Sequence, residues 1–188
     1  MLRTNQSFLA YAQTLYAKQD QNETISLKHY TKGQKLLRQN EVATKVMLIA
    51  DGITKCFFTE PNDKEYILEF LGKGEIIGEI ECIRNIPCLC SIEAMTDVSI
   101  YAFSIPLFQS LLKKDLGLNA LLIDAFAQRI INTASRASYQ QLYTVEHSLA
   151  KLLALQAKQE ISLSKEDMAS YLGITLRSLN RGLKNLQA

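Results

Sequence analysis

The sequence predicts an α+β protein in which an N-terminal antiparallel β-roll of the jelly-roll type is followed by a long helix and a C-terminal helix-turn-helix. Between residues 25 and 104, short segments rich in Val, Ile, Tyr and Phe alternate with turn signals, which is typical of an antiparallel roll. Residues 118–143 contain no Pro or Gly and keep apolar residues at helical spacing. Residues 164–186 have the pattern of two short amphipathic helices separated by a glycine.

The 188 residues are expected to form three parts: a β-roll with an N-terminal helix at 1–108, a connecting segment with the long helix at 109–143, and the helix-turn-helix at 144–188. The composition, 47% apolar and 21% charged, is that of a globular protein. No apolar run is long enough to span a bilayer and the N-terminus does not resemble a secretory signal, so no membrane partner is expected. The four cysteines are therefore expected to be free thiols in a reducing cytoplasm.

The N-terminal part contains one predicted helix and eight predicted strands. The helix is expected at residues 4–20, where apolar side chains at helical spacing would pack on the roll. Asn62-Asp63 lies between two strand-like segments and predicts a hairpin. The strands are expected at 25–31, 34–38, 45–50, 53–59, 64–71, 76–77, 91–95 and 98–104.

The long helix is expected to pair two copies of the chain. Pro106 begins a short helix, Leu107–Lys113, and Gly117 is expected to break it before the long helix starts at Leu118. A helix of roughly 25 residues would be about 37 Å long, too long for a small roll to cover. We therefore expect a symmetric dimer, the alternative being a stripe that packs only within its own chain. The stripe consists of Leu122, Ile123, Phe126, Ile130, Ala134 and Ala137.

The C-terminal part begins with a further predicted helix at about 145–158 and ends in a basic tail. Ser164 is expected to cap the first helix of the helix-turn-helix, with Asp167 as its capping-box partner. Gly173 is expected to form the turn, and Thr175 to cap the second helix. Residues 168–188 contain no Asp or Glu but three cations, so the tail is locally +3 in a chain of net charge +2. Nucleic-acid affinity is expected from this local patch.

The order of these elements, together with two motifs, resembles the Crp/Fnr family of bacterial transcription regulators. Gly74-Glu75-Ile76-Ile77-Gly78-Glu79 is similar to the start of the family's phosphate-binding cassette. Leu172-Gly173-Ile174-Thr175-x-x-Ser178-Leu179-x-Arg181-x-Leu183 is similar to its helix-turn-helix core. The glycines that turn the family's roll correspond to Gly33, Gly52 and, as an Asn substitute, Asn40. The resemblance implies a dimeric, sequence-specific DNA-binding regulator whose partners are double-stranded DNA, RNA polymerase and a small-molecule effector.

The resemblance also implies an effector site in the cassette. In nucleotide-binding members the Gly-Glu backbone and a later Arg-Ser pair hold the cyclic phosphate, and the Glu binds the ribose. Here the Arg-Ser position falls within residues 87–91, which contain no cation. Losing that charge should cost about 3–5 kcal/mol, so neither cyclic AMP nor cyclic GMP is expected to bind tightly. The candidate contacts are Gly78, Glu79, Ile80, Cys88, Leu89, Cys90 and Ser91; for Glu79 a structural role is the alternative.

No metal or other cofactor is expected. Cys82, Cys88 and Cys90 lie close together in the sequence, but their spacing does not match the common four-ligand zinc and iron–sulfur motifs. Cys56 and the two histidines are far away in sequence. The cysteines are therefore expected to be small buried apolar residues, and a redox role for them stays open.

The resemblance places the DNA contacts on the second helix of the helix-turn-helix. Arg177 and Arg181 lie one turn apart and can reach guanine edges or phosphates, and Asn180 can pair with adenine. A solvated surface charge is the alternative for each Arg. Gly182 inside this helix should cost about 1 kcal/mol relative to Ala. The predicted contacts are Thr175, Leu176, Arg177, Ser178, Asn180, Arg181 and Lys184.

Two further hypotheses bear on the function. Family members normally continue with a two-stranded wing, whereas this sequence stops two residues after Leu186, so the wing is missing and the chain is expected to be shortened. The rival hypothesis is a β-roll sensor or scaffold with a degenerate or truncated DNA-binding tail. An enzyme is not expected, because no catalytic arrangement, Walker motif or Rossmann motif is recognisable. The effector, the operator and the choice between activation and repression stay open.

Overall fold

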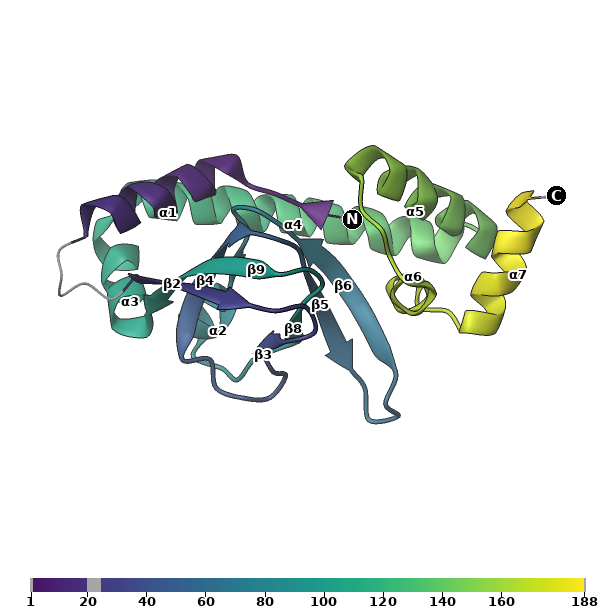
Figure 1. Cartoon of the computed structure of the whole chain (residues 1–188), viewed down its shortest axis with the longest axis horizontal. Coiled ribbons are helices and arrows are strands. Elements are labelled where there is room, and N and C mark those ends of the chain that lie inside the picture. The colour runs from purple at the N-terminus through teal and green to yellow at the C-terminus, as the bar shows by residue number, and fades with distance from the viewer. Residues whose placement is uncertain (1, 20–24, 188) are drawn as a thin grey trace.

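The computed structural model describes residues 2–19 and 25–187. Met1, residues 20–24 and Ala188 lie outside the described residues, and with them the last residue of the helix predicted at 4–20 and the outer ends of the parts predicted at 1–108 and 144–188. The molecule is elongated, with the β-roll at one end and three C-terminal helices at the other (Figure 1). The long helix α4 (Leu116–Leu142) runs along the roll toward those three helices.

Within the described residues, the roll consists of a five-stranded sheet in the order β1-β6-β5-β8-β3 and a four-stranded sheet in the order β2-β9-β4-β7. The eight predicted strands are all confirmed to within one residue at each end. The additional strand β1 (Leu2–Arg3) pairs in parallel with β6 and was not predicted, because two residues carry no readable period. The others are β2 (Ile25–Tyr30), β3 (Lys35–Leu37), β4 (Lys45–Asp51), β5 (Thr54–Thr59), β6 (Glu65–Leu71), β7 (Ile76–Ile77), β8 (Ser91–Ala94) and β9 (Val98–Ser104).

The turns of the roll lie at the turn residues predicted from the sequence. Asn40 has a φ of 66° and Gly52 a φ of 90°, the left-handed region that Gly and Asn tolerate best. At Gly52 a Cβ would lie 2.3 Å from the carbonyl oxygen of Asp97, so no larger residue fits. The predicted hairpin joins β5 to β6 through Asp63, whose φ is 60°.

The helices depart from the prediction in two places. The short helix α2 (Glu79–Arg84) follows Gly78 between the strands predicted at 76–77 and 91–95, where no helix was predicted. The expected break at Gly117 is wrong, because Asp115 caps α4 by accepting a hydrogen bond from the Leu118 amide at 3.0 Å, which leaves Gly117 inside the first turn. The remaining helices are α1 (Gln6–Lys18), α3 (Ile105–Lys114), α5 (Val145–Gln159), α6 (Lys165–Leu172) and α7 (Leu176–Gln187).

The helix-turn-helix caps are confirmed. The Ser164 hydroxyl accepts a hydrogen bond from the Asp167 amide at 2.9 Å, and the Thr175 hydroxyl accepts one from the Ser178 amide at 3.2 Å. Gly173 forms the turn with a φ of 69°. Gly182 also has a structural reason, because a Cβ there would lie 3.2 Å from Cδ2 of the fully buried Leu149 in α5.

The helix-turn-helix shares a core with the roll. Phe57 and Phe70 of the five-stranded sheet pack in one buried cluster with Leu149 of α5, Tyr171 of α6 and Leu179 of α7. Cys56, the neighbour of Phe57 in β5, belongs instead to the cluster inside the roll, as expected from the alternation of side chains along a strand. The sheet therefore uses one face for the interior of the roll and the other to hold the C-terminal helices.

The apolar stripe predicted on α4 divides between two faces. Leu122 is 3% exposed and lies in a core cluster with α1 and α3, and Phe126 packs partly against the same cluster. The dimerisation role predicted for Leu122 is therefore wrong, since the side chain is already used within its own chain. Ile123 and Ile130, by contrast, are each 69% exposed, and Ala134 and Ala137 are exposed as well.

Candidate effector cavity and DNA-binding helix

A cavity of about 480 Å³ lies between the interior of the roll and α4. Aliphatic side chains make up most of its wall, contributed by the strands, by α2 and by α4. Four ionisable side chains face it, namely Glu69, Glu79, Glu81 and Arg129. Two thiols, those of Cys56 and Cys90, complete the wall. The cavity is therefore apolar at most of its surface and charged at the side that faces α4.

Arg129 of α4 is the cation of this cavity. One guanidinium nitrogen donates a hydrogen bond to Oε1 of Glu79, and the other donates to the carbonyl oxygen of Ile76 at 2.6 Å. The second nitrogen also lies 3.6 Å from Oε2 of Glu75. Arg3 extends the network, with its Nη1 2.9 Å from Glu69 Oε2 and its Nη2 2.8 Å from Glu75 Oε2. Three carboxylates thus share two guanidinium groups.

Burial sets the proton affinity of these carboxylates. Burial raises the pKa of the Glu79 carboxyl above the usual range of glutamate, and the positive charge of Arg129 opposes that rise. The pKa of the Glu75 carboxyl is raised for the same reason, with Arg3 and Arg129 opposing. The two arginines are therefore what keeps this cluster charged, because a buried carboxylate without a partner takes up a proton instead.

Five of the seven residues predicted to contact an effector line the cavity: Gly78, Glu79, Ile80, Leu89 and Cys90. The other two are turned elsewhere. The hydroxyl of Ser91 accepts a hydrogen bond from the Gln39 amide at 3.1 Å, and Cys88 is 2% exposed within the core of the roll.

Sequence reasoning missed Arg129, which is the central charged side chain of the cavity. The reason is that Arg129 lies 50 residues beyond Glu79, outside the segment in which the family resemblance implies a cation. A signal was nevertheless present. Residues 116–142 contain only three charged side chains, and two of these, Arg129 and Arg136, are seven residues apart, a spacing that puts both on one face of a helix.

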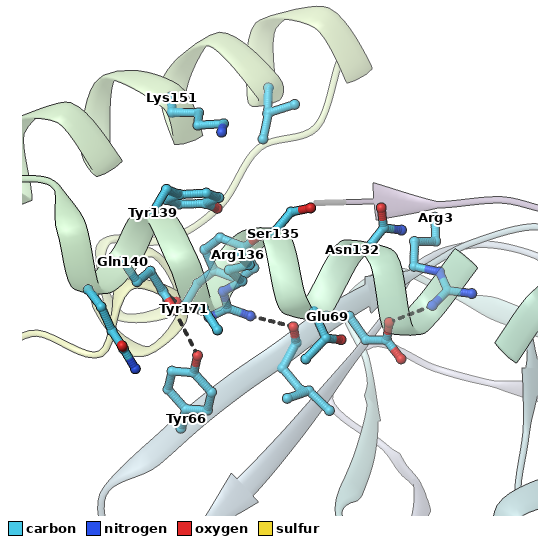
Figure 2. A pocket seen from close by; sticks show the side chains of 15 residues that line it. Arg3, Tyr66, Glu69, Asn132, Ser135, Arg136, Tyr139, Gln140, Lys151 and Tyr171 are labelled. Atoms are coloured by element: carbon cyan, nitrogen blue, oxygen red, sulfur yellow. Dashed lines mark hydrogen bonds and ion pairs between the residues drawn. The ribbon is translucent and has the colours of Figure 1, made fainter. Parts of the chain in front are cut away.

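Arg136 lines a second cavity of about 400 Å³, which lies between the roll, α4 and the helix-turn-helix (Figure 2). Its guanidinium donates to the carbonyl oxygen of Leu68 in β6 and to that of Tyr171 in α6. The same group lies 3.8 Å from the ring centroid of Tyr171 and 4.8 Å from that of Tyr66. Gln140 joins these elements too, donating to the Tyr171 carbonyl at 3.1 Å and accepting from the Tyr66 hydroxyl at 3.0 Å.

The helix predicted to contact DNA stands at the end of the molecule, next to the C-terminus (Figure 1). It buries Leu179 completely and leaves its polar side chains outward. Asn180 accepts a hydrogen bond from Lys165 Nζ at 3.1 Å, and Thr175 is occupied as the helix cap. The predicted contacts are exposed or, for Ser178, partly exposed; the exposed ones are Thr175, Leu176, Arg177, Asn180, Arg181 and Lys184.

Residues 27–115 match the family model of the cyclic nucleotide-binding domain. This part of the chain, the roll from β2 to β9 together with α3, is similar to a cyclic nucleotide-binding domain. Two curated relatives, lysophospholipase nte1 of Aspergillus fumigatus and of Neosartorya fischeri, are 25% and 24% identical to it over 104 residues, or 55% of this chain. The chain spans only about 7% of the length of these relatives.

Solved structures share the fold of the whole chain. The global regulator CLP of Xanthomonas campestris, described as responsive to c-di-GMP, superposes with a TM-score of 0.78 and 20% identity over 97% of this chain and 89% of that chain. TTHB099 of Thermus thermophilus, a transcriptional regulator of the CRP family, superposes with a TM-score of 0.74 and 15% identity. The match covers 85% of this chain and 84% of that chain. FixK2 of Bradyrhizobium japonicum superposes with a TM-score of 0.71 and 18% identity, covering 87% of this chain and 85% of that chain. These likenesses show that the chain has the fold of these regulators, a roll followed by a long helix and a helix-turn-helix.

The charged groups of the cavity differ from those that a cyclic phosphate needs. Three carboxylates and one guanidinium face it, and the guanidinium is already bound to Glu79. Arg84, the cation nearest to the expected position in sequence, ends α2 and is exposed rather than facing the cavity. A buried phosphate requires an unpaired cation and hydrogen-bond donors, and this wall offers a surplus of negative charge in their place.

Proposed function

We propose that this chain is a dimeric transcription regulator that binds DNA through α7 and acts in the cytoplasm. The observation that carries the proposal is the outward face of α7, with three cations and Asn180 exposed on a helix that begins after a capped turn. Bases are read by side chains near the start of such a helix, and neighbouring cations bind phosphates. The Crp/Fnr fold supports the same function, and no helix within residues 2–19 and 25–187 is long and apolar enough to cross a membrane.

The exposed face of α4 supports a symmetric dimer. Its apolar residues alternate at steps of four and three, the spacing of a coiled-coil seam. At its C-terminal end this seam adjoins the face that carries Arg129, because Ile130, Ala134 and Ala137 also line the cavity. Leu116, Ile123 and Ile130 are between 69% and 84% exposed in the single chain. A second copy of the chain would cover this seam, which consists of Leu116, Ala120, Ile123, Ala127, Ile130, Ala134 and Ala137.

The two arginines of α4 support a route from the cavity to DNA. Arg129 binds Glu79 in the wall of the effector cavity, and Arg136 binds the Tyr171 carbonyl in the helix-turn-helix. An effector that moves Glu79 would therefore act on the same helix that positions α6 and α7. In a dimer, such a movement would change the distance between the two recognition helices, which must be about 34 Å for successive major grooves.

The wall of the cavity favours an uncharged, mainly apolar effector over a cyclic nucleotide. Aliphatic side chains would contact the body of such a molecule, and the charged side near Arg129 would accept one polar group. RNA polymerase is proposed as the further partner of a regulator that activates transcription.

Selection of bound sequences from random double-stranded DNA tests the proposed function. A dimeric regulator should enrich a palindromic sequence with half-sites about one helical turn apart. Absence of any enrichment would favour the rival hypothesis, a sensor or scaffold whose tail binds protein. Calorimetric titration with cyclic AMP tests the effector proposal separately, and binding at micromolar concentration would contradict it.

A further inference from the structure

Two thiols that are far apart in the sequence meet in the wall of the effector cavity. Cys56 lies in β5, and Cys90 directly precedes β8. Their Sγ atoms are 2.8 Å apart, although 34 residues separate them. Cys56 is 4% exposed and Cys90 is partly exposed, and both face the cavity.

The pairing of β5 with β8 builds this contact. Cys56 stands opposite Ile92 in the antiparallel register, and Cys90 precedes Ile92 by two residues. Because side chains alternate along a strand, both thiols belong to the face of the sheet that lines the interior of the roll. The sulfur atoms would have to approach by less than about 1 Å to reach the length of a disulfide bond.

We propose that Cys56 and Cys90 are a redox-active pair that forms a reversible intramolecular disulfide in the wall of the cavity, with a hydroperoxide as the oxidant. Cys90 is the sulfur that reacts first, since it is the more exposed and can accept the Cys56 hydrogen bond. Its thiolate attacks the O–O bond of the hydroperoxide, giving a sulfenic acid and, after protonation, an alcohol or water. Cys56 then attacks the sulfenic sulfur, the S–S bond forms, and the displaced hydroxide leaves as water with the Cys56 proton.

The other two thiols have different surroundings. Burial raises the pKa of the Cys88 thiol to about 11, so this thiol stays protonated and inert. Cys82 packs against the cluster formed by α1, α3 and α4, and burial raises the pKa of its thiol as well. The hydrogen bond with Cys90, followed by burial, raises the pKa of Cys56, which fits its role as the second thiol to react.

The disulfide would act next to the charged side of the cavity. Cys56 stands opposite Glu69 in the register of β5 with β6, and Glu69 binds Arg3. On the other side, the Leu89 amide donates a hydrogen bond to Glu81 at 3.1 Å. The bridge would join β5 to the segment that follows α2 and so fix the two sides of the wall. This effect does not depend on the proposed DNA binding.

The test is oxidation of the purified chain carrying Cys82→Ser and Cys88→Ser, which keeps only the proposed pair among the four cysteines. Hydrogen peroxide should remove both titratable thiols, lower the mass by about 2 Da and give one peptide joining Cys56 to Cys90, all reversed by dithiothreitol. The matched control carries Cys56→Ser and Cys90→Ser, and its two thiols should form no intramolecular bridge. In Cys56→Ser alone, dimedone should label Cys90 as the trapped sulfenic acid.

Peptide mapping of the oxidised wild-type chain gives the same answer if a serine variant fails to fold. A bridge between Cys56 and Cys90 supports the proposal. A bridge from Cys90 to Cys82 or Cys88, a disulfide between two chains, or thiols that stay reduced at Cys56 and Cys90 would each overturn it.

Discussion

Arg136 of α4 donates a hydrogen bond to the main-chain carbonyl of Tyr171 in α6, and its guanidinium lies 3.8 Å from the centroid of the Tyr171 ring (Figure 2). The same guanidinium bonds the Leu68 carbonyl in β6, so one side chain joins the long helix, the roll and the helix-turn-helix. Seven residues earlier on the same face, Arg129 reaches the effector cavity. Through these two contacts α4 touches both the wall of the cavity and the helix-turn-helix.

Replacing Arg136 with Met should loosen the attachment of the helix-turn-helix to the roll. The variant loses two charge-assisted hydrogen bonds and two cation–π contacts. Part of this loss is offset, because Met does not require a charge to be buried. We expect the free energy of unfolding to fall by about 2–3 kcal/mol, measured by urea denaturation, and the amides of α6 to exchange hydrogen faster. Lys151→Met is the control, because Lys151 lines the same cavity but is exposed, with its ammonium group over the Tyr139 ring at 3.9 Å. Equal losses in both variants would contradict this role of Arg136.

Removing Arg129 should destabilise the chain more at pH 7 than at pH 5. Burial raises the pKa of Glu75 and Glu79, so the stability these carboxyls contribute is present below their unfolded pKa of about 4.3. It is lost as the pH rises through the higher folded pKa. Arg129→Met removes the charge that opposes the rise, so it moves both folded pKa values further up. We expect a loss of about 3–5 kcal/mol at pH 7 and a clearly smaller one at pH 5, measured by urea denaturation at both values. A loss of the same size at both would exclude this explanation.

An acidic residue in the exposed seam of α4 should separate the proposed dimer. Ile123 is 69% exposed and lies at the seam, away from the effector cavity. Ile123→Glu should place two like charges at the interface, and light scattering should then give the mass of one chain in place of two. Gln128→Glu adds the same charge to an exposed position on the flank of α4 and should leave the mass unchanged. A monomeric wild-type chain at micromolar concentration would refute the dimer itself.

A larger side chain at Gly182 should disturb the packing of α7 on α5. Even a Cβ atom would lie 3.2 Å from Cδ2 of the fully buried Leu149. We expect Gly182→Val to lower the free energy of unfolding by about 2 kcal/mol. Lys184→Val, at an exposed position of the same helix, controls for placing a β-branched residue in α7. If the two variants lose the same stability, close packing is not the reason for the glycine.

The elements of the fold could largely be predicted from the sequence, because each carries its own local signal. Turn residues such as Asn40 and Gly52 marked the strands, and Ser164, Gly173 and Thr175 marked the helix-turn-helix. The elements that were missed or misplaced lack such a signal. β1 is two residues long and exists through its pairing with β6, and the start of α4 depends on the Asp115 cap rather than on Gly117.

The candidate site was predicted less completely, because its contacts join residues that are distant in sequence. Glu79 could be found from the cassette motif, but its partner Arg129 lies 50 residues away on another element. Cys56 was set apart from the other cysteines by its distance along the chain, and the β5–β8 register brings it to Cys90. For α4 the helical period was correct, while the division between its inward and outward faces depends on how α1 and α3 cover Leu122.

The affinity of Arg181→Ala for the DNA sequence selected by the wild-type chain tests most directly that α7 is the DNA-reading helix. Fluorescence anisotropy at one fixed salt concentration should show a loss of about 1–3 kcal/mol, or roughly 5- to 150-fold in Kd. Arg84→Ala removes the same charge from the exposed end of α2 in the roll and should bind as the wild type does. An Arg181→Ala variant that binds as tightly as Arg84→Ala would contradict the proposal that α7 reads DNA.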